Sequence, residues 1–199
     1  MQSSERRCYS AFQEGTPPIF DDLDQQPWSE LTHAYGSAKD VPTWLRQLTS
    51  ADEQTRRAAL MDLYGSICHQ NWNCPATAYA VPYVIELLQQ PSAQQKAGLL
   101  EMLADIASCE PLYEATWREN KGAPAWSVPR HIPLKDAHAA VAIGIPTYLA
   151  LLDHSDLEIR IQAALVLSAF PEHWADLAPA LESALQREPT ESGRVVALI

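Results

Sequence analysis

The amino-acid sequence predicts an all-α protein, a superhelical stack (solenoid) of about four helical hairpins with an N-terminal capping segment. The first observation is the stretch 145–171, where a short polar turn joins two helices with apolar residues at i, i+3, i+4 and i+7. The second is that the hairpin recurs, with prolines at positions 42, 82, 146 and 179, in steps of 40, 64 and 33 residues. Steps in the thirties and forties are typical of helical repeats, and the 64-residue step is one repeat plus an insertion. A single hairpin cannot bury its own apolar stripe, so the copies must stack.

The first 40 residues are expected to form a leader and a cap. Residues 1–27 show no helical period of any length, so we expect only partial order there. Residues 28–35 predict a short helix, with Trp28, Leu31 and Tyr35 on one face and Gly36 as its end. Such a helix would cover the open end of the first hairpin, as terminal repeats require.

The hairpins follow one another within a single domain that spans residues 1–199. The segments are repeat one at 41–75, repeat two at 76–108, an insertion at 109–134, repeat three at 135–171 and a partial repeat four at 172–199. Their helices are expected at about 41–49, 53–69, 76–90, 93–108, 136–152, 156–170, 172–187 and 191–199. The insertion is rich in proline and tryptophan, which is not linker composition, and long structured loops are usually functional or mobile.

A small polar residue precedes a basic residue by four positions in every copy. The pairs are Asp52 with Arg56, Ser92 with Lys96, Asp156 with Arg160, and Thr190 with Arg194. The polar residue is placed to accept a backbone N–H at the start of the second helix. The basic side chain, one turn later, is expected to link successive hairpins into a ladder.

These features resemble the HEAT family of repeats, which has proline early in its first helix and an Asp-x-x-Ile-Arg pattern in its second. Here that pattern is Asp156, Ile159 and Arg160, and the resemblance covers about 40–199. A narrower resemblance, to small stand-alone bacterial HEAT-repeat proteins, rests on His69-Gln70, Ala76-Thr77, Ala80-Val81-Pro82, Ala140-Val141 and Gly144-Ile145-Pro146.

The resemblance implies a HEAT-like α-α superhelix and a non-enzymatic role in binding proteins. HEAT-type proteins occur as immunity proteins beside bacterial toxins, so a toxin-neutralising immunity protein is the sharpest expectation. A scaffold for a host protein is the first alternative. A HEAT-fold enzyme, similar to DNA glycosylases or bilin lyases, is the second, although a repair enzyme should carry a basic face.

Composition and charge narrow the class of partner. A formal net charge of −11 is the reverse of the basic footprint of nucleic-acid binders, and it favours a basic protein partner, with solubility alone as the alternative. No apolar run approaches the ~20 residues of a membrane span, and no secretory signal is seen. Cys8, Cys68, Cys74 and Cys109 form no Cys-x-x-Cys pair, so we expect thiols in a reducing cytoplasm. We expect a cytoplasmic monomer until the partner binds.

The sequence offers little for catalysis or for a cofactor. The spacing of Cys68, His69 and Cys74 is wrong for a structural zinc site, and His69 is better explained as a cap at a helix C-terminus. Cys109 could act as a nucleophile only if a histidine of the insertion or of repeat three lay beside it. No phosphate-binding glycine loop and no nucleophile elbow occurs. We therefore expect no enzyme activity, no metal and no cofactor.

Acidic and aromatic residues are the candidates for partner binding. The candidates are Asp62, Trp72, Glu101, Asp105, Trp117 and Trp126. Glu101 and Asp105 lie one helical turn apart, and with Asp62 from the preceding repeat they would form an acidic strip on the inner curve. The three tryptophans lie in irregular segments, where exposed tryptophan often marks a binding hot spot. The alternatives are a solvated helix face for the acids and loop anchors for the tryptophans. Trp28, Trp44 and Trp174 are expected in the core.

Overall fold

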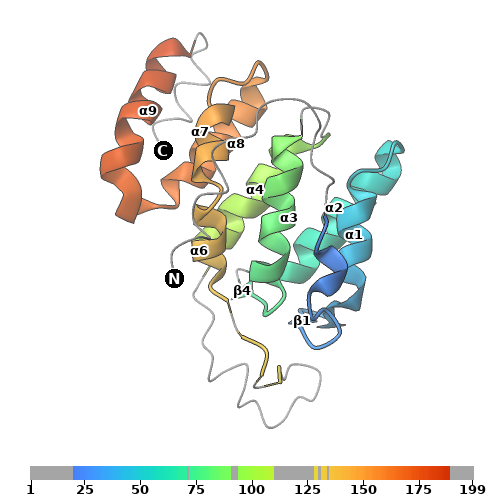
Figure 1. Cartoon of the computed structure of the whole chain (residues 1–199). Helices are drawn as coiled ribbons and strands as arrows, with labels where there is room; N and C mark the ends of the chain where they lie inside the picture. The colour runs from blue at the N-terminus through green and yellow to red at the C-terminus, as the bar shows by residue number, and fades with distance from the viewer. Residues whose placement is uncertain are drawn as a thin grey trace.

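A computed structural model of the chain describes residues 20–70, 72–90, 94–109, 128–129, 131–133 and 135–188. It is mostly helical, which confirms the all-α class (Figure 1). The helices are α1 Val41–Gln47, α2 Glu53–Ile67, α3 Thr77–Gln89, α4 Lys96–Ser108, α6 Ala137–Ala142, α7 Ile145–Leu151, α8 Leu157–Ser168 and α9 Trp174–Arg187. No helix among the described residues is long and apolar enough to cross a membrane.

Helices close in the chain pack as hairpins, and the hairpins lie next to one another (Figure 1). α1 packs against α2, α3 against α4, and α7 against α8. The first helices of the hairpins contact one another, α3 touching α1, α6 and α7, and the second helices do the same, α4 touching α2 and α8. The helices therefore form two layers around one core. The second helix expected at 191–199 lies outside the described residues.

Capping residues and prolines place the helix starts where the sequence predicts them. Asp52 accepts a hydrogen bond from the Thr55 N–H at 2.7 Å, and Asp156 accepts one from the Glu158 N–H at 2.9 Å. Pro42 lies in the first turn of α1, where a missing N–H costs nothing. These contacts confirm the predicted starts of α1, α2 and α8.

The helix expected at 136–152 is broken into α6 and α7 at Ile143 and Gly144. The Tyr148 hydroxyl donates to the Val141 carbonyl at 3.0 Å. The Tyr148 phenol lies so close to Gly144 that a Cβ at this position would overlap the phenol hydroxyl and ring. The buried phenol thus supplies a hydrogen bond to a carbonyl where the helix is interrupted. Only glycine leaves room for the ring at position 144.

The helix expected at 28–35 does not form. Its place is taken by a turn and a small antiparallel hairpin, β1 Thr32–His33 with β2 Gly36–Ser37, closed by Gly36 at a φ of +134°. Trp28 and Leu31 are buried as expected, but Tyr35 is 70% exposed. A contact with a distant part of the chain replaces the expected helix, because the Ala34 N–H donates to the carbonyl of Ser66 at the end of α2.

A second small hairpin, β3 Cys68–His69 with β4 Trp72–Asn73, joins α2 to α3. A helix was expected to reach residue 69, but α2 ends at Ile67 and the chain enters β3. Just after β4, the Cys74 N–H donates to the carbonyl of Ile67 at 3.4 Å. Thr77 fixes the same carbonyl with its hydroxyl, so the chain returns tightly to the end of α2.

The basic side chains brace their own hairpins, which corrects the predicted ladder. Arg56, Lys96 and Arg160 each donate to backbone carbonyls at the end of the helix or in the turn just before them. Arg56 donates to the carbonyls of Ser50 and Ala51 at 2.7 Å and 2.8 Å. Lys96 donates to Leu88 at 2.9 Å, and Arg160 donates to His154 and Ser155 at 2.9 Å and 3.0 Å. Each cation therefore satisfies carbonyls that the turn leaves without helical partners. Of the three, Arg160 also reaches the following helix, through Glu188 at 2.7 Å. Ser92, Thr190 and Arg194 lie outside the described residues.

The core runs through all the described hairpins, and the two small polar hairpins close one end of it. Trp28 is buried and Trp44 partly buried, as expected. Trp174 is 55% exposed, which contradicts the expectation of a core residue. Among the described residues of α9 only Leu177 is fully buried, because this helix packs along one side only.

Candidate binding surface

Of the candidate residues, Trp72 and Asp105 lie near the ends of the second helices α2 and α4. At this end, side chains from neighbouring segments cap the last carbonyls of the two helices. His69 Nδ1 lies 3.0 Å from the Gly65 carbonyl, Asn73 Nδ2 donates to Ile106 at 2.9 Å, and His138 Nδ1 lies 2.8 Å from Ala107. The predicted capping role of His69 is confirmed. These contacts fix the connecting segments rigidly on the helix ends.

The two small hairpins place three aromatic rings side by side. Tyr35 lies edge-on to His69 with ring centroids 5.1 Å apart, and its hydroxyl is 3.3 Å from His69 Nδ1. Trp72 pairs with His69 across the β3–β4 ladder, and cross-strand neighbours point to the same face. Tyr35 is 70% and Trp72 52% exposed. We call Tyr35, His69 and Trp72 the aromatic tip.

The acidic candidates on α4 lie beside a tyrosine of α2. Glu101 and Asp105 are both exposed. The Tyr64 hydroxyl on α2 donates to the Asp105 carboxylate on α4. Burial, followed by this hydrogen bond and the charges of Asp105 and Glu101, raises the pKa of Tyr64. The phenol therefore stays protonated and acts as a donor, while Glu101 is left to face solvent.

Asp62 does not join these two acids, so the predicted strip of three is wrong. Asp62 and Tyr64 are two residues apart on α2, which turns them about 200° from each other around the helix axis. Tyr64 points toward α4, so Asp62 points to the opposite flank of α2. The surface next to α4 carries Glu101 and Asp105 as its acidic pair. Trp117 and Trp126 lie outside the described residues.

Two thiols lie beneath this surface in a contact that sequence analysis did not foresee. Cys68 Sγ and Cys109 Sγ are 3.3 Å apart, and both residues are buried. Cys68 thus faces the core. A signal existed: Tyr64–Asp105 and Cys68–Cys109 are both separated by 41 residues, close to the 40-residue step between Pro42 and Pro82. Equivalent positions of consecutive repeats are neighbours, and the proline step gives the offset.

His138 and His131 contact groups other than Cys109, which bears on the cysteine-nucleophile hypothesis. His138 uses Nδ1 on the Ala107 carbonyl and Nε2 on Glu172 at 2.7 Å. His131 pairs with Glu30 at 2.8 Å. A general base for a thiol must have a free acceptor nitrogen within hydrogen-bond reach.

Within the described part of the chain, no group of three or more His, Cys, Asp or Glu side chains is arranged to hold a metal ion.

A small cavity lies away from this surface, between α8 and α9. It is lined by Leu152, Arg160, Ile161, Ala164, Leu181, Ala184, Leu185 and Glu188, and its volume is about 30 Å³. That volume holds one or two water molecules and no organic substrate.

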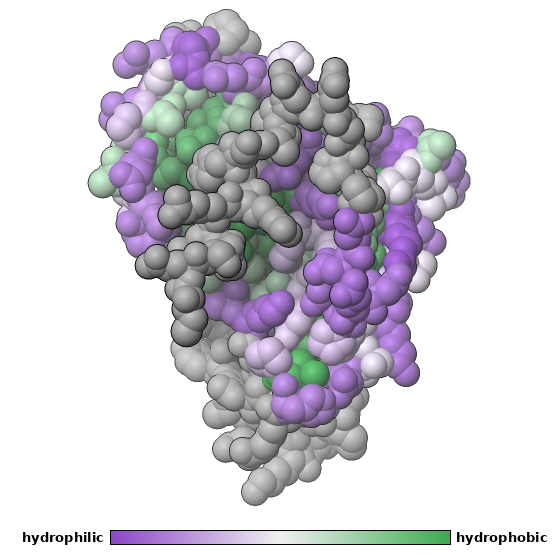
Figure 2. All heavy atoms as spheres, viewed as in Figure 1, coloured by the Kyte–Doolittle hydropathy of each residue, from purple (hydrophilic) through white to green (hydrophobic). Residues whose placement is uncertain are grey.

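Figure 2 shows apolar side chains gathered where α9 meets α7, on a surface that is otherwise mainly polar.

Comparisons with known proteins add little to this geometry. No protein-family model and no curated protein sequence matches the chain. A crystal structure of an engineered protein is similar at 19% sequence identity and a TM-score of 0.48. The match covers 80% of this chain and 62% of the engineered protein, so this chain spans less than two thirds of its length.

Proposed function

We propose that the chain is a HEAT-like solenoid that acts as a non-enzymatic protein-binding module. In its sharpest form, the proposal is an immunity protein that neutralises a basic bacterial toxin in the cytoplasm. The observation that carries it is the exposed aromatic tip, held rigidly at the end of α2, close to the acidic pair of α4. The layered hairpins, each with a carbonyl-binding cation at its turn, support the repeat architecture.

The aromatic tip has the properties of a binding hot spot. Trp and Tyr supply large contact areas and are enriched among the residues that dominate interface energies. Trp72 and Tyr35 sit on hairpins that are already anchored to α2 by backbone hydrogen bonds. Ordering them on binding therefore costs little conformational entropy, which favours affinity.

The charge of the chain determines which partners are favoured. A net charge of −11 attracts a basic protein over a long range and speeds encounter. Glu101 and Asp105 are exposed acids, and Asp105 also accepts a hydrogen bond from the tyrosine hydroxyl. Once the partner is docked, an arginine can lie against the aromatic rings and pair with the acids at the same time.

The experiment is affinity capture from the native bacterium, followed by affinity measurements with the purified partner. Trp72→Ala should weaken binding at least tenfold, mainly through faster dissociation, because a central aromatic anchor is worth about 2 kcal/mol or more. Trp174→Ala is the matched control, since Trp174 is similarly exposed at 55% but lies on α9. Equal losses for the two variants would place the binding site elsewhere and overturn the proposal.

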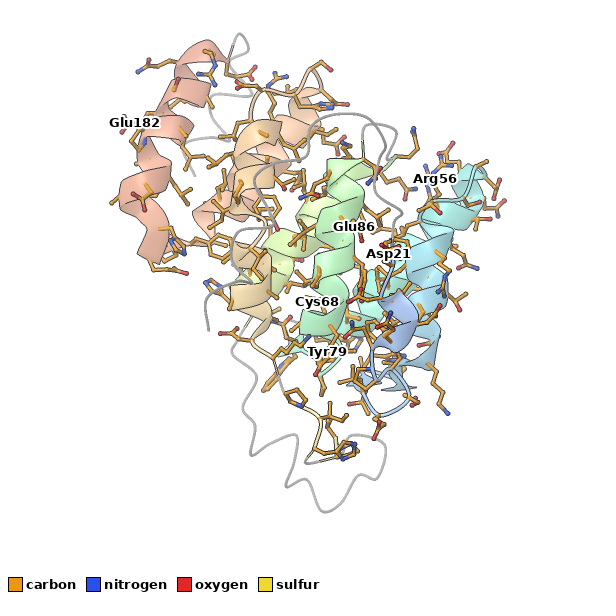
Figure 3. All side chains as sticks on the ribbon, in the orientation of Figure 1. Asp21, Arg56, Cys68, Tyr79, Glu86 and Glu182 are labelled. Carbon is orange, nitrogen blue, oxygen red and sulfur yellow. The ribbon has the colours of Figure 1, made fainter. Side chains whose placement is uncertain are left out.

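Charge reversal tests the acidic side of the surface. Glu101→Lys should slow association several-fold, and Asp62→Lys should do less, since Asp62 is on the far flank of α2. Glu182→Lys on α9 is the matched control (Figure 3), because it makes the same change in net charge far from the tip. Equal effects of all three reversals would mean that only net charge matters.

Co-expression decides between immunity and scaffolding. If the captured partner arrests growth when it is expressed alone, this chain should restore growth, and Trp72→Ala should restore it less. A harmless partner would replace the immunity role with that of a scaffold.

A further inference from the structure

We propose that Cys68 and Cys109 form an oxidisable dithiol, a modification site at which a hydroperoxide converts two thiols into an intramolecular disulfide. The two sulfur atoms are 3.3 Å apart. A disulfide bond measures about 2.05 Å, so the sulfurs must approach by only about 1 Å. This inference is independent of the proposed binding function.

The surrounding hydrogen bonds hold the two thiols face to face. Cys68 opens β3 and pairs with Asn73 across the ladder, and the Asn73 side chain donates to the carbonyl of Ile106 at 2.9 Å. Cys109 is the C-cap residue of α4, and its N–H contacts the same carbonyl at 3.4 Å. Asn73 thus links the backbone of one cysteine to that of the other. Both cysteines lie at helix ends, where small backbone shifts are tolerated better than inside a helix.

The hydrogen bond between the two sulfur atoms affects the pKa values of the two thiols in opposite directions. The hydrogen bond from Cys68 lowers the pKa of Cys109, and the same bond together with burial raises the pKa of Cys68. The charge of Asp105 opposes ionisation of both thiols. With Cys109 as the attacking sulfur, Cys68 acts as the resolving thiol, and the exchange of these two roles leads to the same disulfide.

The chemistry balances with hydrogen peroxide as the two-electron oxidant. The Cys109 sulfur attacks one peroxide oxygen, the O–O bond breaks, and a sulfenic acid forms with release of one water. The Cys68 sulfur then attacks the sulfenic sulfur, the S–O bond breaks, and a second water leaves with the Cys68 proton. Two electrons pass from the thiols to the peroxide, and a thiol reductant reverses the bond.

The third buried cysteine near the pair is not a competing partner. Cys74 is 3% exposed, and its thiol lies 3.5 Å from the Ser66 carbonyl, to which it donates. Burial, followed by the charge of Cys109, raises the pKa of Cys74 to about 12. Cys74 therefore stays protonated and hydrogen-bonded at neutral pH.

Peptide mapping of the full chain tests the assignment. The reduced protein is exposed to hydrogen peroxide, its remaining thiols are alkylated, and it is digested without reductant for mass spectrometry. We expect a single linked pair of peptides carrying Cys68 and Cys109, lighter by two hydrogen atoms. The link should persist in the Cys8→Ala/Cys74→Ala variant and disappear in Cys109→Ala. A link to Cys74 or Cys8, or sulfinic and sulfonic acids without any link, would overturn the proposal. Because the wild-type map decides the outcome, a folding defect in one variant leaves the test intact.

Discussion

Removing the guanidinium of Arg160 should destabilise the fold far more than an ordinary surface change does. One end of the guanidinium donates to the His154 and Ser155 carbonyls, and the other contacts Glu188 Oε2 at 2.7 Å and 3.0 Å. The Arg160 and Glu188 side chains are 21% and 8% exposed. Arg160→Ala therefore leaves a buried carboxylate and two turn carbonyls without this donor. Breaking a buried pair in this way costs about 3–5 kcal/mol, and partial exposure of Arg160 places our expectation near 3 kcal/mol.

Arg187→Ala is the matched control. Arg187 pairs with Asp153 at 2.6 Å, but the two side chains are 53% and 70% exposed. Exposed pairs contribute about 0–1 kcal/mol. Urea unfolding followed by circular dichroism should show a clear fall in midpoint for Arg160→Ala at an unchanged slope, and almost none for Arg187→Ala. Equal midpoints for the two variants would refute the reasoning that this guanidinium joins α8 to α9.

Three further predictions concern pH, packing and oxidation. Burial alone would lower the pKa of His138, but its hydrogen bonds to Glu172 and to the Ala107 carbonyl outweigh burial, and the charge of Asp136 adds to them, so the pKa rises above 6.5. The stability that His138 contributes is thus fully present below about pH 6.5 and is lost as pH rises through the raised pKa. His138→Gln should remove that slope from pH-dependent thermal melts, whereas His131→Gln, at a side chain 68% exposed, should not. Gly144→Ala should cost about 1–3 kcal/mol in urea unfolding because its Cβ would overlap the Tyr148 ring. Gly65→Ala on α2, where nothing lies within 4 Å, should instead stabilise by up to about 1 kcal/mol. Closing the 41-residue span between Cys68 and Cys109 should stabilise the oxidised protein by about 4 kcal/mol, and calorimetry with and without reductant measures the shift.

Local patterns predicted the helices because the determinants of a helix are local. Capping by Asp52 and Asp156, proline in the first turn of α1 and the apolar stripes all act within a few residues. The predicted starts of α1, α2 and α8 therefore agree with the structure within about one residue. The break at Gly144 escaped prediction, since its cause is the ring of Tyr148 folding back over the glycine.

The aromatic tip could not be predicted, because tertiary contacts override the local pattern there. Trp28, Leu31 and Tyr35 have helical spacing, yet Ser66 at the end of α2 captures the Ala34 N–H and turns the chain into a hairpin. Tyr35 then meets His69, 34 residues away, in a contact that belongs to no repeat. The sequence therefore identified Trp72 as a candidate and missed the tyrosine and histidine beside it.

A constant offset between contacting residues of α2 and α4 explains why one acidic candidate failed while the thiol pair and the Tyr64–Asp105 contact formed. Across α2 and α4, side chains 41 residues apart touch, as Tyr64 touches Asp105 and Cys68 touches Cys109. The residue 41 positions after Asp62 is Leu103, which is fully buried. The position of α4 that corresponds to Asp62 therefore holds no acid. A strip of charge along a stack of repeats requires acids at the same offset as the contacts. Had that offset been applied to the chain, Tyr64 would have been the predicted neighbour of Asp105. The aromatic and acidic parts of the proposed surface thus have different origins, since the 41-residue offset between α2 and α4 sets the second and the two small β-hairpins supply the first.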